Sequence, residues 1–241
     1  MSKNKFITFS FDDGFISDFK MAELLEKYGF ECTFFIATSH DQGALGTGDI
    51  KTLSQISDIG GHTCNHKILS SLERDEQKNE IIDNKKYLED LIGKEIHLFC
   101  YPKGKYSNQT IEVVKASGFW GARTTKCFHY RIQSPFEIPT SLQIYPHTYF
   151  THFRHSLVGK DIKSLKLLIP SFAERLGLIE TIQYLANKVY ENGGVLHLWG
   201  HTWELDKLNI WEYFENILSI LKDYEFQPIN NSDLVLNNKN I

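Results

Sequence analysis

Short runs of apolar residues alternate along the chain with longer segments in which apolar residues recur every three or four positions. The short runs are typical of buried β-strands, and the spaced segments are typical of amphipathic helices. The pattern predicts strands at residues 5–11, 32–37, 97–101, 119–124, 195–201 and 226–229. It predicts helices at residues 18–28, 49–59, 71–92, 108–117, 163–176, 179–192 and 211–223.

This alternation of strand and helix predicts a parallel α/β sheet or barrel. A chain of 241 residues with 41% hydrophobic content suits one globular domain, or at most two small ones. No repeat or clear linker divides it, so we expect a single domain over residues 1–241. Residues 126–157 hold three prolines and are expected to form loops, and the polar tail from about residue 232 is expected to be loose.

Charge and cysteine content narrow the function classes. The formal charge is −4 and no long basic run occurs, so a nucleic-acid-binding surface is not expected. No apolar stretch is long enough for a signal peptide or a membrane span, so we expect a cytoplasmic protein. The four cysteines show no C-x-x-C spacing and are expected to be free thiols. The pattern specifies no oligomeric state.

Polar clusters follow the predicted strands at the points where they end. Asp12 and Asp13 follow the first strand, and His62 and His66 follow a pair of glycines. Further clusters occupy residues 101–104 and 201–204, each next to the end of a later strand. In parallel α/β folds ligands bind at the carboxyl ends of the strands. We therefore expect these clusters to converge on one mouth.

Each cluster alone has an ordinary explanation, but together they indicate a metal site. Asp-Asp-Gly is common turn chemistry, and His62 and His66 could be two unrelated surface histidines. The spacing His-x-x-x-His also puts two imidazoles on one face of a helical turn, close enough to share a divalent ion. Adjacent strand side chains point in opposite directions, so one aspartate can bind a metal while the other accepts a proton. Two histidines and one carboxylate with open positions form a hydrolytic metal site.

The order of these motifs resembles the polysaccharide deacetylases, the NodB-homology carbohydrate esterases. The resemblance rests on Ser-Phe-Asp-Asp-Gly, on His-Thr-x-x-His about fifty residues later and on the cluster at residues 101–104. It implies a deformed (β/α) barrel, TIM-like, with about seven strands. It implies that Asp12 is the catalytic base and that Asp13, His62 and His66 hold the metal. It also implies a substrate groove walled by Tyr101, Pro102, Lys103 and Gly104, in which the backbone N–H of Lys103 helps to stabilise the oxyanion.

One position departs from the family pattern. The third motif often begins with an arginine that contacts the catalytic base, whereas this chain has Cys100. Arg123, near the end of the following predicted strand, is a candidate substitute, although a surface charge is the other interpretation. The departure bears directly on how the charge of Asp12 is set.

The last family motif is a strand-borne Leu-x-His whose histidine is the general acid. Both His197 and His201 fit, and equal parity along the strand lets both face the barrel interior. We choose His201 because it lies nearer the carboxyl end of the strand, which leaves His197 as a core histidine. Trp199 is expected to close the acyl pocket. Glu204 could bind substrate, brace His201 or cap a loop.

These expectations describe a metal-dependent hydrolase that removes an N-acetyl or other N-acyl group from an amino sugar. Zinc fits two histidines and one carboxylate best, with cobalt, nickel, iron and manganese as alternatives. The expected partner is a carbohydrate or a small amide. Two other functions stay open: hydrolysis of another linear or cyclic amide at the same site, and a catalytically inactive sugar-binding relative, for which Cys100 is the best support.

Overall fold

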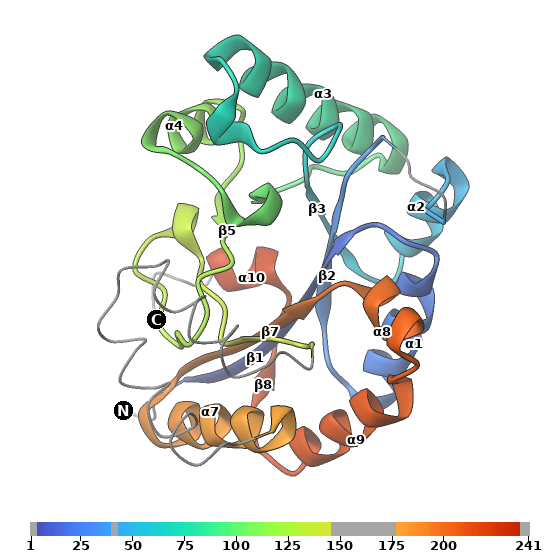
Figure 1. The fold of residues 1–241 in the computed structure, drawn as a ribbon, viewed down its shortest axis with the longest axis vertical. Helices are drawn as coiled ribbons and strands as arrows, with labels where there is room; N and C mark the ends of the chain where they lie inside the picture. Colours follow the sequence, from blue (N-terminus) through green and yellow to red (C-terminus); the bar gives the residue numbers. More distant parts are fainter. Residues whose placement is uncertain (1–3, 40–42, 146–176, 237–241) are drawn as a thin grey trace.

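The structure is a computed structural model that describes residues 4–39, 43–145 and 177–236. In these residues one sheet follows the path β5-β4-β3-β2-β1-β7-β6, with β8 also paired to β1, and every pair is parallel. The sheet curls into an incomplete barrel, which confirms the predicted deformed barrel (Figure 1). The strands are β1 (Lys5–Asp13), β2 (Cys32–Ile36), β3 (Asp58–Gly61), β4 (Leu98–Cys100), β5 (Gly121–Arg123), β6 (Leu142–Gln143), β7 (Gly194–Gly200) and β8 (Gln227–Pro228).

Most helices surround the curled sheet on its outer side, and the short helix at residues 231–236 lies within the curl, against β1 and β2 (Figure 1). Helices α3 (Arg74–Ile92) and α4 (Asn108–Ala116) lie beyond β3 to β5. Helices α7 (Leu178–Asn192) and α9 (Trp211–Lys222) pack beside β1 and β7, at the other side of the barrel. The helices are α1 (Ser17–Tyr28), α2 (Thr47–Leu53), α3 (Arg74–Ile92), α4 (Asn108–Ala116), α7 (Leu178–Asn192), α8 (Thr202–Leu208), α9 (Trp211–Lys222) and α10 (Asn231–Leu236). None of these helices is long and apolar enough to cross a bilayer within the residues that the structure describes.

The centre of the core lies on β1, which pairs with both β2 and β7. Phe9 and Phe11 of this strand are completely buried. Their ring centres lie 5.3–6.5 Å from those of three other phenylalanines. Phe30 comes from the turn before β2, Phe34 from β2 itself and Phe214 from α9. Burying one such ring stabilises the fold by about 1.5–3 kcal/mol. The strand that ends in the two aspartates is therefore held rigidly from both sides.

The predicted helix at residues 49–59 is wrong in its second half. Helix α2 ends at Leu53, and residues 58–61 form strand β3 instead. The two glycines are required here by close packing. A Cβ at Gly60 would lie 2.4 Å from the ring of Phe35, and one at Gly61 would lie 2.7 Å from the side chain of Asn84. The glycine pair is thus a strand packed tightly against its neighbours and not a helix stop.

Besides β3, three more of the helices and strands named above were not expected. Strand β6 and helix α8 lie in segments that the pattern left without structure, and α10 covers residues 231–236 of the tail expected to be loose. Helix α10 is held because Asn231 and Ser232 are buried, and Ser232 Oγ lies 2.9 Å from each carboxylate oxygen of Asp58. The helix predicted at residues 163–176 lies outside the described residues.

Candidate metal centre

Side chains from three strand ends meet at the mouth of the barrel. Asp13 is the last residue of β1, His62 directly follows β3, and His201 directly follows β7. One donor atom from each of Asp13, His62 and His66 lies within 4.8 Å of the other two. The Nε2 atoms of His62 and His66 lie 3.8 Å and 3.5 Å from Asp13 Oδ1. Three of the four clusters that were expected to converge therefore lie together, those at residues 12–13, 62–66 and 201–204.

The two histidines reach this arrangement by a route that the sequence argument did not foresee. The His-x-x-x-His spacing was expected to form a helical turn, and this is wrong, because residues 62–68 are not helical. Thr63 and His66 instead adopt left-handed backbone conformations, with φ of 67° and 47°. Such conformations cost about 1–3 kcal/mol each and occur mostly where function requires them.

Helix α3 supports this loop from behind. Asn84 Oδ1 accepts a hydrogen bond from the backbone N–H of His62 at 3.0 Å, and Asn84 Nδ2 donates to the carbonyl of Ile36 at 3.0 Å. Glu80 accepts from the backbone and side chain of Asn65 at 2.8 Å and 2.7 Å. Sequence reasoning missed these two supports. The available signal was their spacing of four residues on one face of a predicted helix.

The state of His62 suits a metal ligand. Its Nδ1 lies 2.8 Å from the carbonyl oxygen of Cys100, which can only accept, so Nδ1 carries the proton. Its Nε2 is buried and has no hydrogen-bond partner among the described residues. Burial lowers the pKa of His62 to about 4, against the opposing charges of Asp12 and Asp13, so the ring is neutral. A buried lone pair without a donor is costly, and a divalent cation satisfies it.

Asp12 lies beside this group and is paired with Arg123. The guanidinium of Arg123, on β5, forms an ion pair with Asp12 Oδ1 and lies 2.9 Å from the sulfur of Cys100. Both side chains are almost completely buried. Burial alone would raise the pKa of Asp12, but the charges of Arg123, His62 and His201 outweigh it and lower the pKa to about 2. The guanidinium of Arg123 thus contacts both Asp12 and the side chain of Cys100.

The two candidate histidines on β7 differ sharply in their surroundings. His201 Nε2 lies 3.9 Å from Asp13 Oδ2, and its Nδ1 lies 2.9 Å from Glu204 Oε2. Burial alone would lower the pKa of His201, but the hydrogen bond to Glu204 and the nearby carboxylates raise it. His197 is buried and hydrogen-bonded to Ser10 Oγ and the Pro139 carbonyl, and burial lowers its pKa to about 3. Only His201 of this pair lies beside the predicted metal ligands.

The residues expected to line the substrate groove occupy different environments. The side chain of Tyr101 is completely buried and donates to the carbonyl of Phe136 at 3.1 Å, so it belongs to the core. Pro102 and Gly104 form a short 3₁₀ turn around Lys103, which is exposed and has a left-handed φ of 53°. The Tyr101 side chain therefore packs in the core, and the groove predicted along residues 101–104 stays a prediction.

Trp199 and Trp203 flank His201. Trp199 is nearly buried, with the guanidinium carbon of Arg123 4.7 Å from its ring centre and the ring of His201 5.7 Å away. Trp203, on the unpredicted helix α8, donates its indole N–H to Asp13 Oδ2 at 3.1 Å. Sequence reasoning missed Trp203, because no helix was predicted at residues 202–208.

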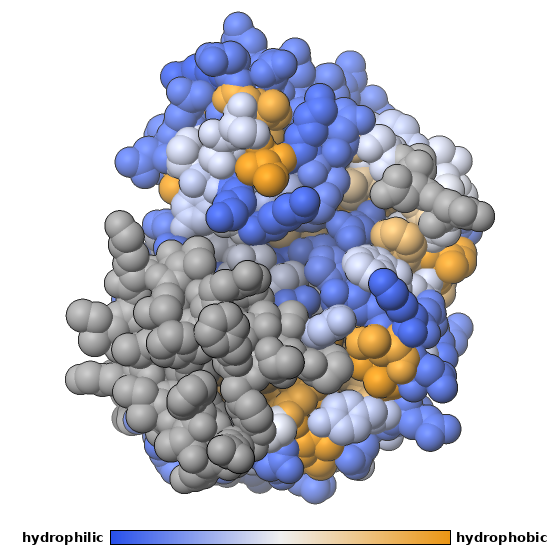
Figure 2. Space-filling view, viewed as in Figure 1, coloured by the Kyte–Doolittle hydropathy of each residue, from blue (hydrophilic) through white to orange (hydrophobic). Residues whose placement is uncertain are grey.

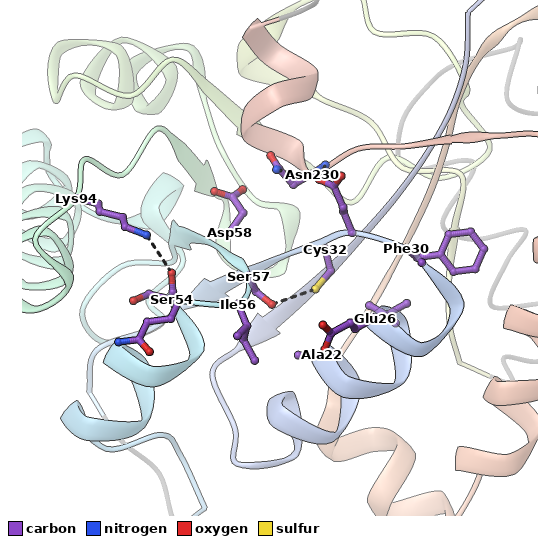
Figure 3. A pocket seen from close by; sticks show the side chains of 14 residues that line it. Ala22, Glu26, Phe30, Cys32, Ser54, Ile56, Ser57, Asp58, Lys94 and Asn230 are labelled. Carbon is purple, nitrogen blue, oxygen red and sulfur yellow. Dashed lines mark hydrogen bonds between the residues drawn. The ribbon is translucent and has the colours of Figure 1, made fainter.

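The surface around the centre is recessed. Figure 2 shows that the middle of this face, between the part built by α3 and α4 and the part built by α1 and α8, is hollowed and mostly hydrophilic. A second cavity, of about 550 Å³, lies at the amino ends of β2 and β3 (Figure 3). There Asp58 accepts hydrogen bonds from the Thr33 hydroxyl and from the hydroxyl and backbone N–H of Ser232, and burial raises its pKa to about 6. It lies at the opposite strand ends from the predicted ligands.

A family model and two curated relatives all point to the same family of deacetylases. Residues 2–122 match the family model described as polysaccharide deacetylase. YxkH of Bacillus subtilis, named as a polysaccharide deacetylase, is 28% identical over 127 residues, which cover 51% of this chain and 45% of that protein. Peptidoglycan-N-acetylglucosamine deacetylase of Bacillus cereus is 30% identical over 120 residues, or 49% of this chain and 55% of the relative. The chain spans about half the length of these curated relatives.

Among solved structures, a CE4 family pseudoenzyme from Bacillus anthracis superimposes with a TM-score of 0.62 at 13% identity. The match covers 96% of this chain and 66% of that protein. At this identity the likeness supports the fold alone.

Proposed function

The chain belongs to the polysaccharide deacetylase family, and on this basis we propose that it is a metal-dependent hydrolase that removes an N-acetyl group from an amino sugar. The observation that carries the proposal is the convergence of Asp13, His62 and His66, with the Nε2 of His62 buried and without a hydrogen-bond partner in the described part of the chain. The sugar itself is proposed from the family and from the name of the Bacillus cereus relative, a peptidoglycan-N-acetylglucosamine deacetylase.

Asp13, His62 and His66 would hold the metal. When bound, such an ion polarises the acyl carbonyl and lowers the pKa of a water molecule. Two nitrogen ligands and one carboxylate favour zinc, with cobalt, nickel, iron and manganese as alternatives. The hydrogen bond from His62 Nδ1 to the Cys100 carbonyl supports this role, because ligating histidines usually donate their second ring nitrogen in this way.

Asp12 is proposed as the general base that takes a proton from the attacking water. A base must be ionised at working pH, and Arg123 keeps the carboxyl group charged although it is buried. We propose that Arg123 replaces the family arginine, whose position in the sequence is Cys100. The small thiol leaves room for a guanidinium that enters from β5 rather than β4. This pairing speaks against an inactive sugar-binding relative, since such a protein has no need to hold Asp12 charged.

His201 is proposed as the general acid that protonates the leaving amine. It has a raised pKa and lies on the opposite side of Asp13 from the two histidine ligands. Glu204 is proposed to orient the ring and to stabilise its charged form through Nδ1. The backbone N–H of Lys103 is proposed to stabilise the oxygen of the tetrahedral intermediate, and Trp199 to line the acyl pocket.

The proposal is tested with the purified chain, a chromogenic acetyl ester and an N-acetylated amino-sugar oligomer. We expect turnover that is lost on chelation and restored by zinc or cobalt. Asp13→Ala should lose turnover and tight metal binding together. An exposed aspartate on α3, Asp75, gives a matched control, because Asp75→Ala removes the same charge far from the mouth. Metal-dependent turnover that survives Asp13→Ala would overturn the proposal.

A further inference from the structure

The two carboxylate oxygens of Asp13 face different partners. Oδ1 lies 3.8 Å and 3.5 Å from the Nε2 atoms of His62 and His66. Oδ2 lies on the other side, where it accepts the indole N–H of Trp203 at 3.1 Å. His201 Nε2 is 3.9 Å from the same oxygen. Only Oδ1 therefore points toward the two histidines that would share a metal with it.

Trp203 is held firmly in this position. Its ring packs between Phe15, with ring centres 6.2 Å apart, and His201, with ring centres 5.4 Å apart. The start of its helix is tied to α1, since the Thr202 hydroxyl donates to the buried carboxyl group of Asp18 at 2.7 Å. The indole N–H cannot accept a proton or a metal, so its one role toward Asp13 is to donate.

We propose that Trp203 is a positioning residue that occupies Oδ2 of Asp13 and thereby presents Oδ1 as the metal ligand. A carboxylate at the end of a short side chain rotates broadly about its last torsion, and either oxygen, or both, can bind a cation. A fixed donor on one oxygen removes this freedom. The inference rests on the proposed metal site, and it adds a residue that the sequence motifs do not include.

The same short helix also positions the proposed acid. Glu204, next to Trp203, accepts from His201 Nδ1 at 2.9 Å. Two consecutive residues of α8 thus orient the side chains on the two sides of the reacting centre: Trp203 sets Asp13, and Glu204 sets His201. Partners of this kind typically change metal affinity or activity by about 10–100-fold when they are removed.

The test compares Trp203→Phe with Trp211→Phe. Trp211 is a matched control, because its indole also donates to a single aspartate oxygen, Asp206 Oδ1 at 2.7 Å, and Asp206 is not one of the proposed site residues. Zinc and cobalt affinities are measured by calorimetry and by competition with a chelator. We expect Trp203→Phe to bind metal about 10–100-fold more weakly, and Trp211→Phe to stay within about twofold of the wild type.

A second readout follows the indole hydrogen bond itself and is independent of metal affinity. The chain has four tryptophans, so its proton–nitrogen correlation spectrum contains four indole N–H signals. Asp13→Ala should shift one of them strongly, and Trp211→Phe assigns the control signal, which should not move. A Trp203→Phe spectrum that lacks the shifted signal supports the inference. No strong shift in Asp13→Ala would overturn it.

The outcomes separate this inference from the proposal on which it rests. If the wild type binds neither zinc nor cobalt, both fail. If the wild type binds metal tightly and folded Trp203→Phe binds it equally tightly, the metal site stands and the positioning role of Trp203 is overturned.

Discussion

Asp12 and Asp18 are both buried in the same part of the fold, yet their surroundings drive their pKa values in opposite directions. Asp12 is paired with Arg123, and its pKa is lowered to about 2. Asp18 accepts hydrogen bonds only from the Thr202 hydroxyl and the backbone N–H of Phe15, and burial raises its pKa to about 8. Burial alone therefore neutralises a carboxyl group in this protein, and a buried cation is what keeps one charged.

The difference explains why only one of the two carboxylates suits base chemistry. A general base must be ionised before it can take a proton, which Asp12 is at any pH above about 2. Asp18 is protonated at neutral pH and instead joins α1 to α8, the helix that carries Trp203 and Glu204. One carboxyl group is proposed to act in the reaction, and the other supports the helix beside it.

The largest expected effect is the loss of turnover when the charged carboxylate, Asp12, is replaced. Asp12→Asn should lower kcat by about 10²–10⁴-fold, because the amide cannot take a proton from water. Metal affinity should change little, since Asp12 is not a proposed ligand. Steady-state kinetics and zinc calorimetry on the same preparation measure both. Turnover close to the wild type would remove Asp12 from the proposed mechanism.

Removing the cation should convert Asp12 into a group that resembles Asp18. Arg123→Met leaves a buried carboxylate without a partner and should destabilise the fold by about 3–5 kcal/mol. The pKa of Asp12 should rise, so the acidic limb of the pH–activity profile should move to higher pH. Urea denaturation and the profile of kcat/KM against pH measure the two effects.

Arg131 gives a matched control for this variant, because it is exposed and donates only to the carbonyl of Asn192 at 3.0 Å. Arg131→Met should leave both measurements unchanged. A double variant, Cys100→Arg with Arg123→Ala, should recover part of the lost activity by supplying the guanidinium from β4. An unchanged acidic limb in Arg123→Met would contradict the assigned role of Arg123.

Asp18 should make the folded state less stable as the pH rises, whereas a carboxyl group with a lowered pKa, such as Asp12, does the opposite. Its pKa is about 8 in the folded chain and 3.8 ordinarily, so the folded state binds the extra proton between these values. Stability from this group is therefore greatest at low pH and is lost as the pH rises toward 8. Asp18→Asn should be more stable than the wild type at pH 9, relative to pH 5, by about 2–5 kcal/mol, since one pKa unit corresponds to about 1.4 kcal/mol. Urea denaturation at the two pH values decides this.

Asp58, at the opposite strand ends, should show the smallest effect in the same direction. Its pKa of about 6 places the loss of stability between pH 4 and 6. Asp58→Asn should gain about 1–3 kcal/mol relative to the wild type across that window, with no change in turnover. A change in kcat would mean that the cavity of Figure 3 communicates with the mouth.

Much of the fold followed from hydrophobic periodicity, and the failures have local physical causes. Strand β1 and helix α1 appear where the pattern placed them, within two residues. The helix predicted through Ile59 was wrong in its second half, because Gly60 and Gly61 belong to a strand that packs against Phe35 and Asn84. These contacts are distant in sequence and leave no local pattern that would reveal them. Short elements such as β6 and α8 are too brief to show a period.

The candidate site likewise contains residues that sequence motifs predict and residues that only the structure reveals. Asp13, His62 and His66 could be chosen from motif order, although the backbone that joins the histidines is a left-handed loop and not a helix. The contact between Arg123 and Asp12 spans 111 positions and could only be suspected. Trp203 carried no signal at all, because its function depends on one indole N–H meeting one oxygen.

The central claim is that Asp13, His62 and His66 share one divalent ion, and crystals soaked in cobalt or zinc test it most directly. Anomalous diffraction should place a single ion bonded to Asp13 Oδ1 and to the two Nε2 atoms, with bonds of about 2.0–2.2 Å. An ion held instead by Asp12, His62 and Cys100, the other cluster with suitable donor atoms, would contradict the claim. So would the absence of any ion at this mouth at saturating metal.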